Sequence, residues 1–317
     1  MSNLAPSISV VIPTYRREEV LLQTLTALSQ LEHPPGEILV MDQTPTHPPQ
    51  VEQELKRQEA EGHIRHIRLP APSIPVAMNL GVREAKGDLV LFLDDDIIPS
   101  PDLVANHCRA HAAHPEAWAV VGQIIQPTPH RPTRPRRPMH LTQDLDVNFA
   151  SDQPRWLTNI MAGNCSVLRA RFLELGGFDE NFIPPVSFRF ETEFAKRLIA
   201  AGGRIWFEPR ASIQHLRVSR GGTRATGSHL SSPSPYHSVG AYYYFLRQGC
   251  GWDRIWQIAR RPFREVRTKY HLAHPWHIPV KFIGEIRAII LALRRSRRGP
   301  RLLTPPPDVP RRSPVAP

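Results

Sequence analysis

The chain has 317 residues, of which 41% are hydrophobic and 22% charged; this excludes wholesale disorder and allows one large α/β domain or two modest ones. Its formal net charge of +11 lies mostly in two Pro/Arg-rich stretches, residues 127–138 and 294–317, so no nucleic-acid partner is expected. Three scattered cysteines without a CxxC pair suit a reducing cytoplasm. No signal peptide or membrane-spanning run is readable, so we expect a cytoplasmic protein that is at most peripheral on the membrane.

The first part of the chain alternates apolar runs with helical patterns. Strands are predicted at residues 8–14, 37–42, 64–69, 87–93 and 118–125, and helices at 18–31 and 74–85. Strands that alternate with helices predict an α/β fold with a mostly parallel sheet and helices on both faces. Ligands bind outside the carboxyl ends of such strands, so Thr14-Tyr15, Asp42 and Asp94-Asp95-Asp96 are expected to converge on one crevice.

The second part begins with a proline-dense stretch, residues 127–138, which we interpret as a loop. A strand is predicted at 160–168, a helix at 191–201 that ends at Gly202-Gly203, and short strands at 205–207 and 212–215. The pattern is helical from Ser238 and typical of a disordered tail from Arg294. The predicted domains are an α/β domain at 1–225 (halves 7–126 and 139–225), a C-terminal helical extension at 226–293 and a tail at 294–317.

Three aspartates, Asp94-Asp95-Asp96, directly follow the apolar run LVLFL. Like charges this close together are costly unless a cation neutralises them. Hard oxygen ligands at the end of a strand suit Mg²⁺ or Mn²⁺, which also bridge diphosphates. The alternative is an acidic turn that caps the next helix near Pro101.

Four sequence blocks follow one another in a defined order. They are ISVVIPTYRR (8–17), AMNLGVREAKGDLVLFLDDD (77–96), GNCSVLRARFLELGGFDENF (163–182) and ETEFAKRLIAAGGRIWFEP (191–209). In this order the chain resembles the family 2 glycosyltransferases, whose nucleotide-sugar-binding fold is called GT-A, over residues 7–225. The resemblance implies an inverting, divalent-metal-dependent transfer of sugar from a UDP-, dTDP- or GDP-sugar donor to a saccharide or lipid-linked acceptor.

The resemblance also implies roles for individual residues. The donor would contact Pro13, Thr14, Tyr15, Asp42, Asn79, Asp94 and Asp95, with Asp42 accepting a hydrogen bond from the base. Mn²⁺ or Mg²⁺ would be held by Asp94, Asp96 and His215, unless His215 is an ordinary strand-end histidine bonded to a carbonyl. The general base would be Glu191, with Glu193 in reserve.

The sequence departs from the family at two places. Phe190 and Glu191 stand where the family has an acidic pair, and Met78 stands where it often has arginine. These departures keep open a second reading, a catalytically silent binding or scaffold protein of the same fold. A sugar-phosphate nucleotidyltransferase is disfavoured, because such enzymes usually have a Gly-rich loop after the first strand and this chain has IPTYRRE.

Two further segments each allow two readings. The basic loop at 217–224 either closes over the diphosphate or is a solvated turn. Near the C-terminus, apolar residues recur at helical spacing: Ile278, Phe282, Ile283, Ile286, Ile289, Ile290 and Leu293. With the arginines that follow, this stripe predicts either a helix in the interface of an anionic membrane, on the inner face of the cell membrane, or a helix packed on the α/β domain.

Overall fold

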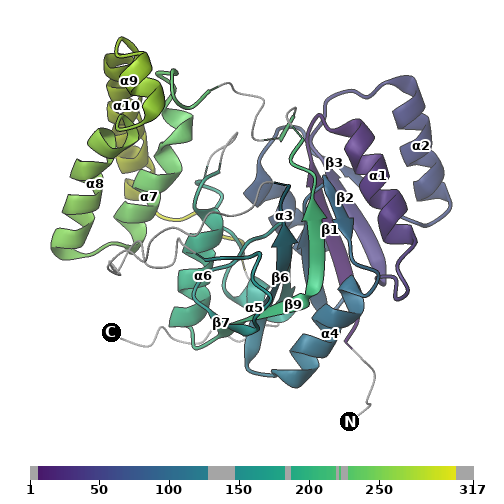
Figure 1. The fold of residues 1–317 in the computed structure, drawn as a ribbon. Helices are drawn as coiled ribbons and strands as arrows, with labels where there is room; N and C mark the ends of the chain where they lie inside the picture. The colour runs from purple at the N-terminus through teal and green to yellow at the C-terminus, as the bar shows by residue number, and fades with distance from the viewer. Residues whose placement is uncertain (1–5, 128–146, 183–186, 219–220, 223–227, 305–317) are drawn as a thin grey trace.

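The computed structural model describes residues 6–127, 147–182, 187–218, 221–222 and 228–304 (Figure 1). Most of the loop predicted at 127–138 lies outside these residues. One sheet has the strand order β3-β2-β1-β4-β8-β6-β9-β5, and β7 pairs with β9. The strands are β1 (Ile8–Thr14), β2 (Glu37–Asp42), β3 (Arg65–Arg68), β4 (Leu89–Leu93), β5 (Ile97–Pro99), β6 (Ala117–Ile125), β7 (Arg155–Leu157), β8 (Asn164–Leu168) and β9 (Arg204–His215).

The two halves of the sheet differ in strand direction. In the first half β1 pairs in parallel with β2 and β4, and β2 with β3, as predicted. In the second half β8 runs antiparallel to β4 and β6, while β9 is parallel to β6. The two short strands predicted at 205–207 and 212–215 are one strand, β9, whose register against β6 shifts after Gly122. In the sequence, the segment of β9 near this register shift resembled a gap between two separate strands.

Helices cover both faces of the sheet, which confirms the predicted architecture. One face carries α1 (Glu18–Ser29), α2 (Pro49–Ala60) and α4 (Leu103–Ala113); the other carries α3 (Ile74–Glu84), α5 (Arg169–Glu174) and α6 (Phe190–Ala200). Successive side chains of a strand point to opposite faces. Accordingly Val10 and Ile12 of β1 belong to the core under α1, and Val11 belongs to the core under α3.

The C-terminal extension is a bundle of four helices beside the sheet: α7 (Val239–Gln248), α8 (Gly251–Glu265), α9 (Lys269–Ala273) and α10 (His277–Arg297) (Figure 1). Consecutive tyrosines 242–244 on α7 are fully buried. They belong to the same hydrophobic core as Phe194 of α6 and Ala288 of α10. The extension is therefore continuous with the core on the α3, α5 and α6 face.

The end of the chain differs from the prediction. Helix α10 continues through Arg297, so the tail expected from Arg294 begins later than the sequence indicated. The backbone N–H of Arg301 donates to Asp179 Oδ1 at 2.9 Å, and that of Leu303 donates to the Gly176 carbonyl at 2.8 Å. These bonds tie residues 298–304 to the turn after α5. Residues 305–317 lie outside the described part of the chain, and the domain boundary at 225 stays a prediction.

Candidate functional site

The three aspartates stand at the end of β4 and have different surroundings. Asp95 is buried; its Oδ2 accepts a hydrogen bond from Thr14 Oγ1 at 2.7 Å, and its Oδ1 one from Arg17 Nη1 at 2.8 Å. Asp96 is also buried, whereas the side chain of Asp94 is 39% exposed. Asp95 thus joins the ends of β1 and β4, while Asp94 is left accessible.

A possible metal site is formed where β5 pairs with β9. This antiparallel pairing sets Ile97 opposite His215 and so brings the imidazole beside Asp96. His215 Nε2 lies 3.2 Å from Asp96 Oδ1 and 3.4 Å from Asp94 Oδ2, and the possible ligand atoms of the three residues lie within 4.8 Å of one another. His215 is therefore next to the predicted metal ligands rather than bonded to a carbonyl through Nε2.

These residues fit a divalent cation. Asp96 Oδ1 is buried and has no hydrogen bond among the described residues; its contacts are the ion pairs with His215 and Arg17 at 3.2 Å, which a cation could replace. Two carboxylates and one imidazole are a suitable donor set for Mn²⁺, and less so for Mg²⁺. Burial alone would lower the pKa of His215, but Asp94 and Asp96 raise it to about 9. A bound cation would displace that proton, so metal affinity should rise with pH.

A pocket of about 280 Å³ opens at this end of the sheet. Its lining includes Pro13, Thr14 and Tyr15 from the end of β1 and Asp94 and Asp95 from the end of β4, all predicted donor contacts. The far wall is formed by the segment that leads into β8 and by the segment that leads into α6, together with the first residues of α6. It includes Met161, Ala162, Gly163, Ser187, Phe188, Arg189, Phe190 and Glu191. The carboxyl ends of β1 and β4 therefore converge as the topology predicted.

Glu191 faces this pocket from the first turn of α6. Its Oε1 accepts the backbone N–H of Ala162 at 2.5 Å. Burial raises the pKa of Glu191 to about 7, helped by the charge of Asp94 and opposed by the Ala162 N–H. A carboxyl group with a pKa near neutrality is suited to exchange protons at physiological pH.

Glu193, the reserve base, is placed elsewhere. It is 1% exposed, and its carboxylate pairs with Arg197 at 2.8 Å and accepts a hydrogen bond from Gln248 at 3.2 Å. The described lining of the pocket does not include it. Two residues further along a helix, a side chain points about 200° around the axis. Glu193 thus links α6 to α7, and the structure favours Glu191 as the predicted base.

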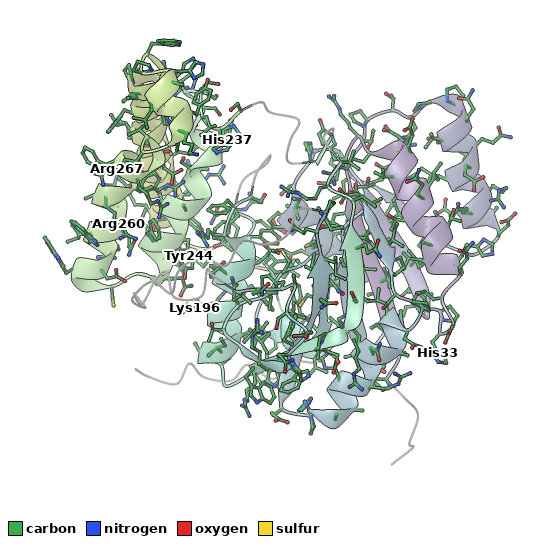
Figure 2. The ribbon with its side chains drawn as sticks, in the orientation of Figure 1. His33, Lys196, His237, Tyr244, Arg260 and Arg267 are labelled. Carbon is green, nitrogen blue, oxygen red and sulfur yellow. The ribbon has the colours of Figure 1, made fainter. Side chains whose placement is uncertain are left out.

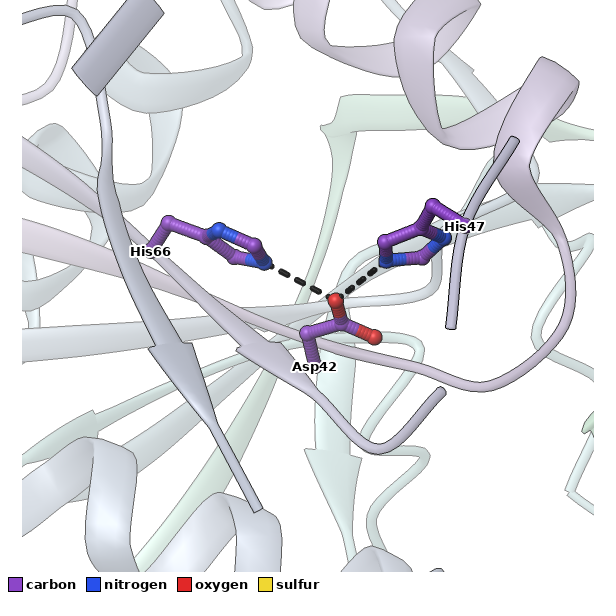
Figure 3. Close-up of side chains that lie close together, drawn as sticks. All are labelled: Asp42, His47 and His66. Carbon is purple, nitrogen blue, oxygen red and sulfur yellow. Dashed lines mark hydrogen bonds and ion pairs between the residues drawn. The ribbon is translucent and has the colours of Figure 1, made fainter. Parts of the chain in front are cut away.

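Asp42 does not lie in the described lining of the pocket, although it ends β2 as predicted; Gln43 lies there instead. The Asp42 side chain is fully buried, and its Oδ2 contacts His47 Nε2 at 2.6 Å and His66 Nε2 at 2.8 Å (Figure 3). Its Oδ1 accepts the backbone N–H of Thr44 at 2.8 Å. The carboxylate is thus engaged by protein groups, and its contact with the nucleotide base stays a prediction.

Asn79 is likewise engaged by protein groups. It is fully buried in α3, where its Nδ2 donates to the Phe178 carbonyl at 2.9 Å and its Oδ1 accepts the Phe178 N–H at 2.8 Å. Gly177 precedes this clamp with φ of +65°, and a Cβ there would come within 2.6 Å of Asn79 Oδ1. Asn79 and the GGFDE turn thus belong to one structural contact, and the contact of Asn79 with the donor stays a prediction.

Two pocket residues, Arg17 and Arg189, were missed by the sequence reasoning. Arg17 Nη1 lies 2.8 Å from Asp95 Oδ1 and 3.2 Å from Asp96 Oδ1. The sequence did contain a signal for Arg17, because it is a basic residue shortly after the first strand, whose end was predicted to meet the acidic end of the fourth strand. Arg189 precedes α6 with φ of +81°, and its Nε has no hydrogen-bond partner among the described residues. It brings positive charge to a pocket in which Met78 replaces the arginine frequent in the family.

Part of the loop at 217–224 can be placed. The Gly222 N–H donates to the Tyr15 carbonyl at 2.9 Å, and the Val218 N–H donates to Asp96 Oδ2 at 3.1 Å. Gly222 also lines the pocket. The described part of the loop therefore lies against the aspartate cluster, whereas Arg220 and Arg224 lie outside the described residues, and closure over the diphosphate stays one of two alternatives.

The sheet, the acidic end of β4 and the pocket beside it define a GT-A-type domain. The chain belongs to glycosyl transferase family 2, whose family model matches residues 9–176. It is 27% identical over 207 residues to validoxylamine A glucosyltransferase from Streptomyces hygroscopicus subsp. limoneus, covering 56% of this chain and 45% of that protein. It is 24% identical over 178 residues to glucosyl-dolichyl phosphate glucuronosyltransferase from Haloferax volcanii, covering 55% and 56%.

The chain thus spans about half the length of these curated relatives. Among solved structures it resembles a mannosyltransferase from Pyrobaculum calidifontis in complex with GDP-Man and Mn²⁺, with a TM-score of 0.54 and 18% identity. That match covers 95% of this chain and 77% of the other, so the likeness of fold includes most of the C-terminal extension.

Proposed function

We propose that the protein is an inverting glycosyltransferase that moves a sugar from a nucleotide-sugar donor to a saccharide or lipid-linked acceptor with the help of Mn²⁺ or Mg²⁺. One observation carries the proposal: Asp94 and Glu191 line the same pocket, so a metal-binding carboxylate and a group able to take up a proton face one cavity. The solved mannosyltransferase binds GDP-Man and Mn²⁺, which supports this class of donor and metal.

Each residue has a part in the proposed reaction. Asp94, Asp96 and His215 hold the cation, which when bound neutralises the charge that develops on the departing nucleoside diphosphate. Glu191 takes the proton of the acceptor hydroxyl as that oxygen attacks the anomeric carbon. Attack and departure occur on opposite faces of the sugar in a single displacement, so the anomeric configuration inverts.

The other reading is a binding protein of the same fold without catalytic activity. Phe190 supports it, because the first residue of the usual acidic pair is here an aromatic side chain that is 6% exposed. The two readings are separated by incubating purified protein with a panel of UDP-, dTDP- and GDP-sugars and measuring nucleotide release with Mn²⁺ and with EDTA. Release that needs Mn²⁺ supports the enzyme, and donor binding without release for every sugar supports the silent protein.

For the acceptor we propose a lipid-linked or membrane-proximal saccharide at the inner face of the cell membrane. One curated relative is named for a dolichyl phosphate substrate. Among the described residues no helix has the length and apolar character needed to cross a bilayer. Any membrane contact through the described helices would therefore be peripheral.

The extension supports such a contact through an unusual distribution of residues. Helix α10 packs on α7 with a face made of Lys281, Gly284, Glu285, Ala288 and Ala292. Its apolar residues Ile283, Ile286, Ile290 and Leu293 are exposed, which is the reverse of an ordinary surface helix. Trp252 on α8 is 75% exposed, and Trp276, just before α10, is 63% exposed. Exposed tryptophans suit the interface region of a bilayer.

Basic residues accompany these apolar side chains. The last turn of α10 carries Arg294, Arg295 and Arg297. Arg260 and Arg267 lie on the extension, on the side away from the sheet (Figure 2). Apolar side chains beside arginines bind the interface of anionic membranes.

Co-sedimentation with vesicles tests this contact. We expect the full chain to sediment with vesicles containing anionic lipid and much less with neutral ones. Trp256, also on α8, is 47% exposed, and the double variant Trp252→Ser/Trp256→Ser should stay in the supernatant. The control, Ile199→Ser, removes an exposed apolar residue from α6 and should sediment like the wild type. Recovery of the wild type in the supernatant at low salt contradicts the membrane proposal without affecting the proposed chemistry.

A further inference from the structure

Outside the pocket, Asp42, His47 and His66 form a compact group, here called the Asp42 cluster (Figure 3). Asp42 ends β2, His66 lies on the neighbouring strand β3, and His47 lies in the segment between β2 and α2. The side chains of Asp42, His66 and His47 are 0%, 6% and 1% exposed, respectively. Both imidazoles direct Nε2 at the same carboxylate oxygen, Asp42 Oδ2, at 2.6 and 2.8 Å (Figure 3).

The arrangement of partners around His47 points to a cation. Its Nε2 faces Asp42, and its Nδ1 lies 3.3 Å from Glu18 Oε1. A neutral imidazole has one N–H, so it cannot donate to carboxylates on both sides. Both contacts are satisfied by a protonated imidazolium, or by a metal ion between Asp42 and the two Nε2 atoms, in which case the Nδ1–H of His47 donates to Glu18. A carboxylate on the outer nitrogen of a ligating histidine is the usual support of protein metal sites.

We propose that Asp42, His47 and His66 bind a divalent transition-metal ion of the zinc class, at a site separate from Asp94, Asp96 and His215. Two imidazoles and one carboxylate form a more nitrogen-rich donor set than the pocket offers, and such sets select zinc over magnesium or manganese. Ligands of a tetrahedral zinc ion lie about 3.3 Å apart, given bonds of ~2.0–2.1 Å. To reach that spacing from 2.6 and 2.8 Å, the Nε2 atoms of His47 and His66 need to move away from Oδ2 by about 0.7 and about 0.5 Å.

The ion would support the wall of the pocket. The next residue, Gln43, lines the pocket, and Thr44 donates its backbone N–H to Asp42 Oδ1 at 2.8 Å. The Thr44 hydroxyl in turn accepts the backbone N–H of Arg16 at 2.8 Å. A metal that joins β2, β3 and the segment before α2 would therefore fix the loop behind Pro13, Thr14 and Tyr15. This inference does not depend on the proposed transferase activity.

Metal binding by the full chain tests the site. The starting protein is the double variant Asp96→Asn/His215→Gln, which disables the site in the pocket, stripped with EDTA. Titration with Co²⁺ should give one equivalent bound, with the intense visible absorption of four-coordinate cobalt. His47→Gln or His66→Gln in this background should remove the absorption and lower the affinity by at least about tenfold, as loss of a ligand does.

Two controls are matched to the chain. His63→Gln changes a nearby histidine whose side chain is 62% exposed, and His33→Gln disrupts the exposed group of Glu32, His33 and Asp102 (His33 is shown in Figure 2). Both should keep the absorption. The proposal is overturned if the double variant binds no Co²⁺, or if His33→Gln abolishes the signal while His47→Gln and His66→Gln retain it.

A second measurement guards against variants that do not fold. X-ray absorption at the zinc edge of the zinc-loaded double variant should show imidazole scattering from two histidines. A first shell without imidazole overturns the proposal. Zinc should also raise the melting temperature of the double variant but not that of its His66→Gln derivative, provided that both melt alike in EDTA.

Discussion

Buried charged side chains occur in two regions of this molecule, and the regions differ in how completely hydrogen bonds satisfy these charges. In the C-terminal extension, both oxygens of the fully buried Glu285 are matched: Oε1 by Ser238 and by Lys281 at 2.9 Å, and Oε2 by Tyr242 at 2.7 Å. In the pocket, Asp96 Oδ1 is buried without a hydrogen bond among the described residues. Asp94, in contact with the same histidine, is open to the pocket.

This difference indicates that the charges in the extension stabilise the fold, whereas those at the pocket are available for binding. A buried charge with all its partners holds helices together, because breaking the set leaves an isolated charge in a low dielectric. Asp96, beside the pocket, has ion-pair contacts but no hydrogen bond at Oδ1, and Asp94 is partly exposed, so this carboxylate group is less fully compensated and can gain from a bound cation. Changes at the pocket should therefore affect function, and changes in the extension should affect stability.

The largest expected effect is at Asp96. Asp96→Ala removes a predicted metal ligand, so transfer should fall by at least about 10³-fold, since a metal contributes several kcal/mol to such reactions. Donor binding should lose its dependence on Mn²⁺ while the circular dichroism spectrum stays the same. Calorimetric titration of the donor with and without Mn²⁺ measures this. Transfer within a few-fold of the wild type would mean that the metal is held elsewhere.

Next in size is Glu191. Glu191→Gln should lower kcat by about 10²–10⁴, the range for a lost general base, with little change in donor affinity. Glu193→Gln is the matched control on the same helix turn; it should keep kcat within a few-fold while weakening the link to Arg197. Steady-state kinetics of both variants decide between them. The reverse ranking would show that the base is misassigned.

The extension should respond in stability. Glu285→Gln leaves Lys281 buried without its counter-charge and Arg261 with Glu265 as its remaining acidic partner, so the free energy of unfolding should fall by about 3–5 kcal/mol. Glu116→Gln disrupts an exposed pair with Arg204 and should cost about 0–1 kcal/mol. Urea denaturation followed by circular dichroism measures both. Equal losses would mean that burial does not distinguish the two pairs.

The smallest effect is the pH dependence of the pocket. Glu191 acts in its ionised form, and burial raises its pKa to about 7, so kcat/KM should rise about tenfold per pH unit up to pH ~7 and then level off. A raised pKa also means that the stability contribution of the protonated group is lost as pH rises from about 4.5 to about 7. Glu191→Gln should flatten both profiles. A kcat/KM profile unchanged in that variant would contradict the assignment.

Much of the pocket could be predicted because its chemistry follows strand ends. Thr14 and Asp94 end buried apolar runs, and the ends of β1 and β4 meet because these strands are parallel neighbours. Asp42 and Asn79 were predicted from the same motifs, but the described lining of the pocket does not include them. Asp42 is held by His47 and His66, and Asn79 by Phe178, contacts that span up to 99 residues of sequence. No local pattern encodes such partners.

The sequence by itself determined the α/β class, the order of the first strands and the acidic centre, because alternating apolar periodicity and strand-end polarity are local properties. Only the tertiary structure decided which carboxylates face the pocket, because Glu191 and Glu193 differ solely in their direction around α6. It also decided what α10 buries. The apolar stripe allowed a face toward the protein or toward a membrane; in the structure Glu285 and Lys281 lie inside and Ile286 and Ile290 outside, since packing against α7 provides the partners that buried charges require.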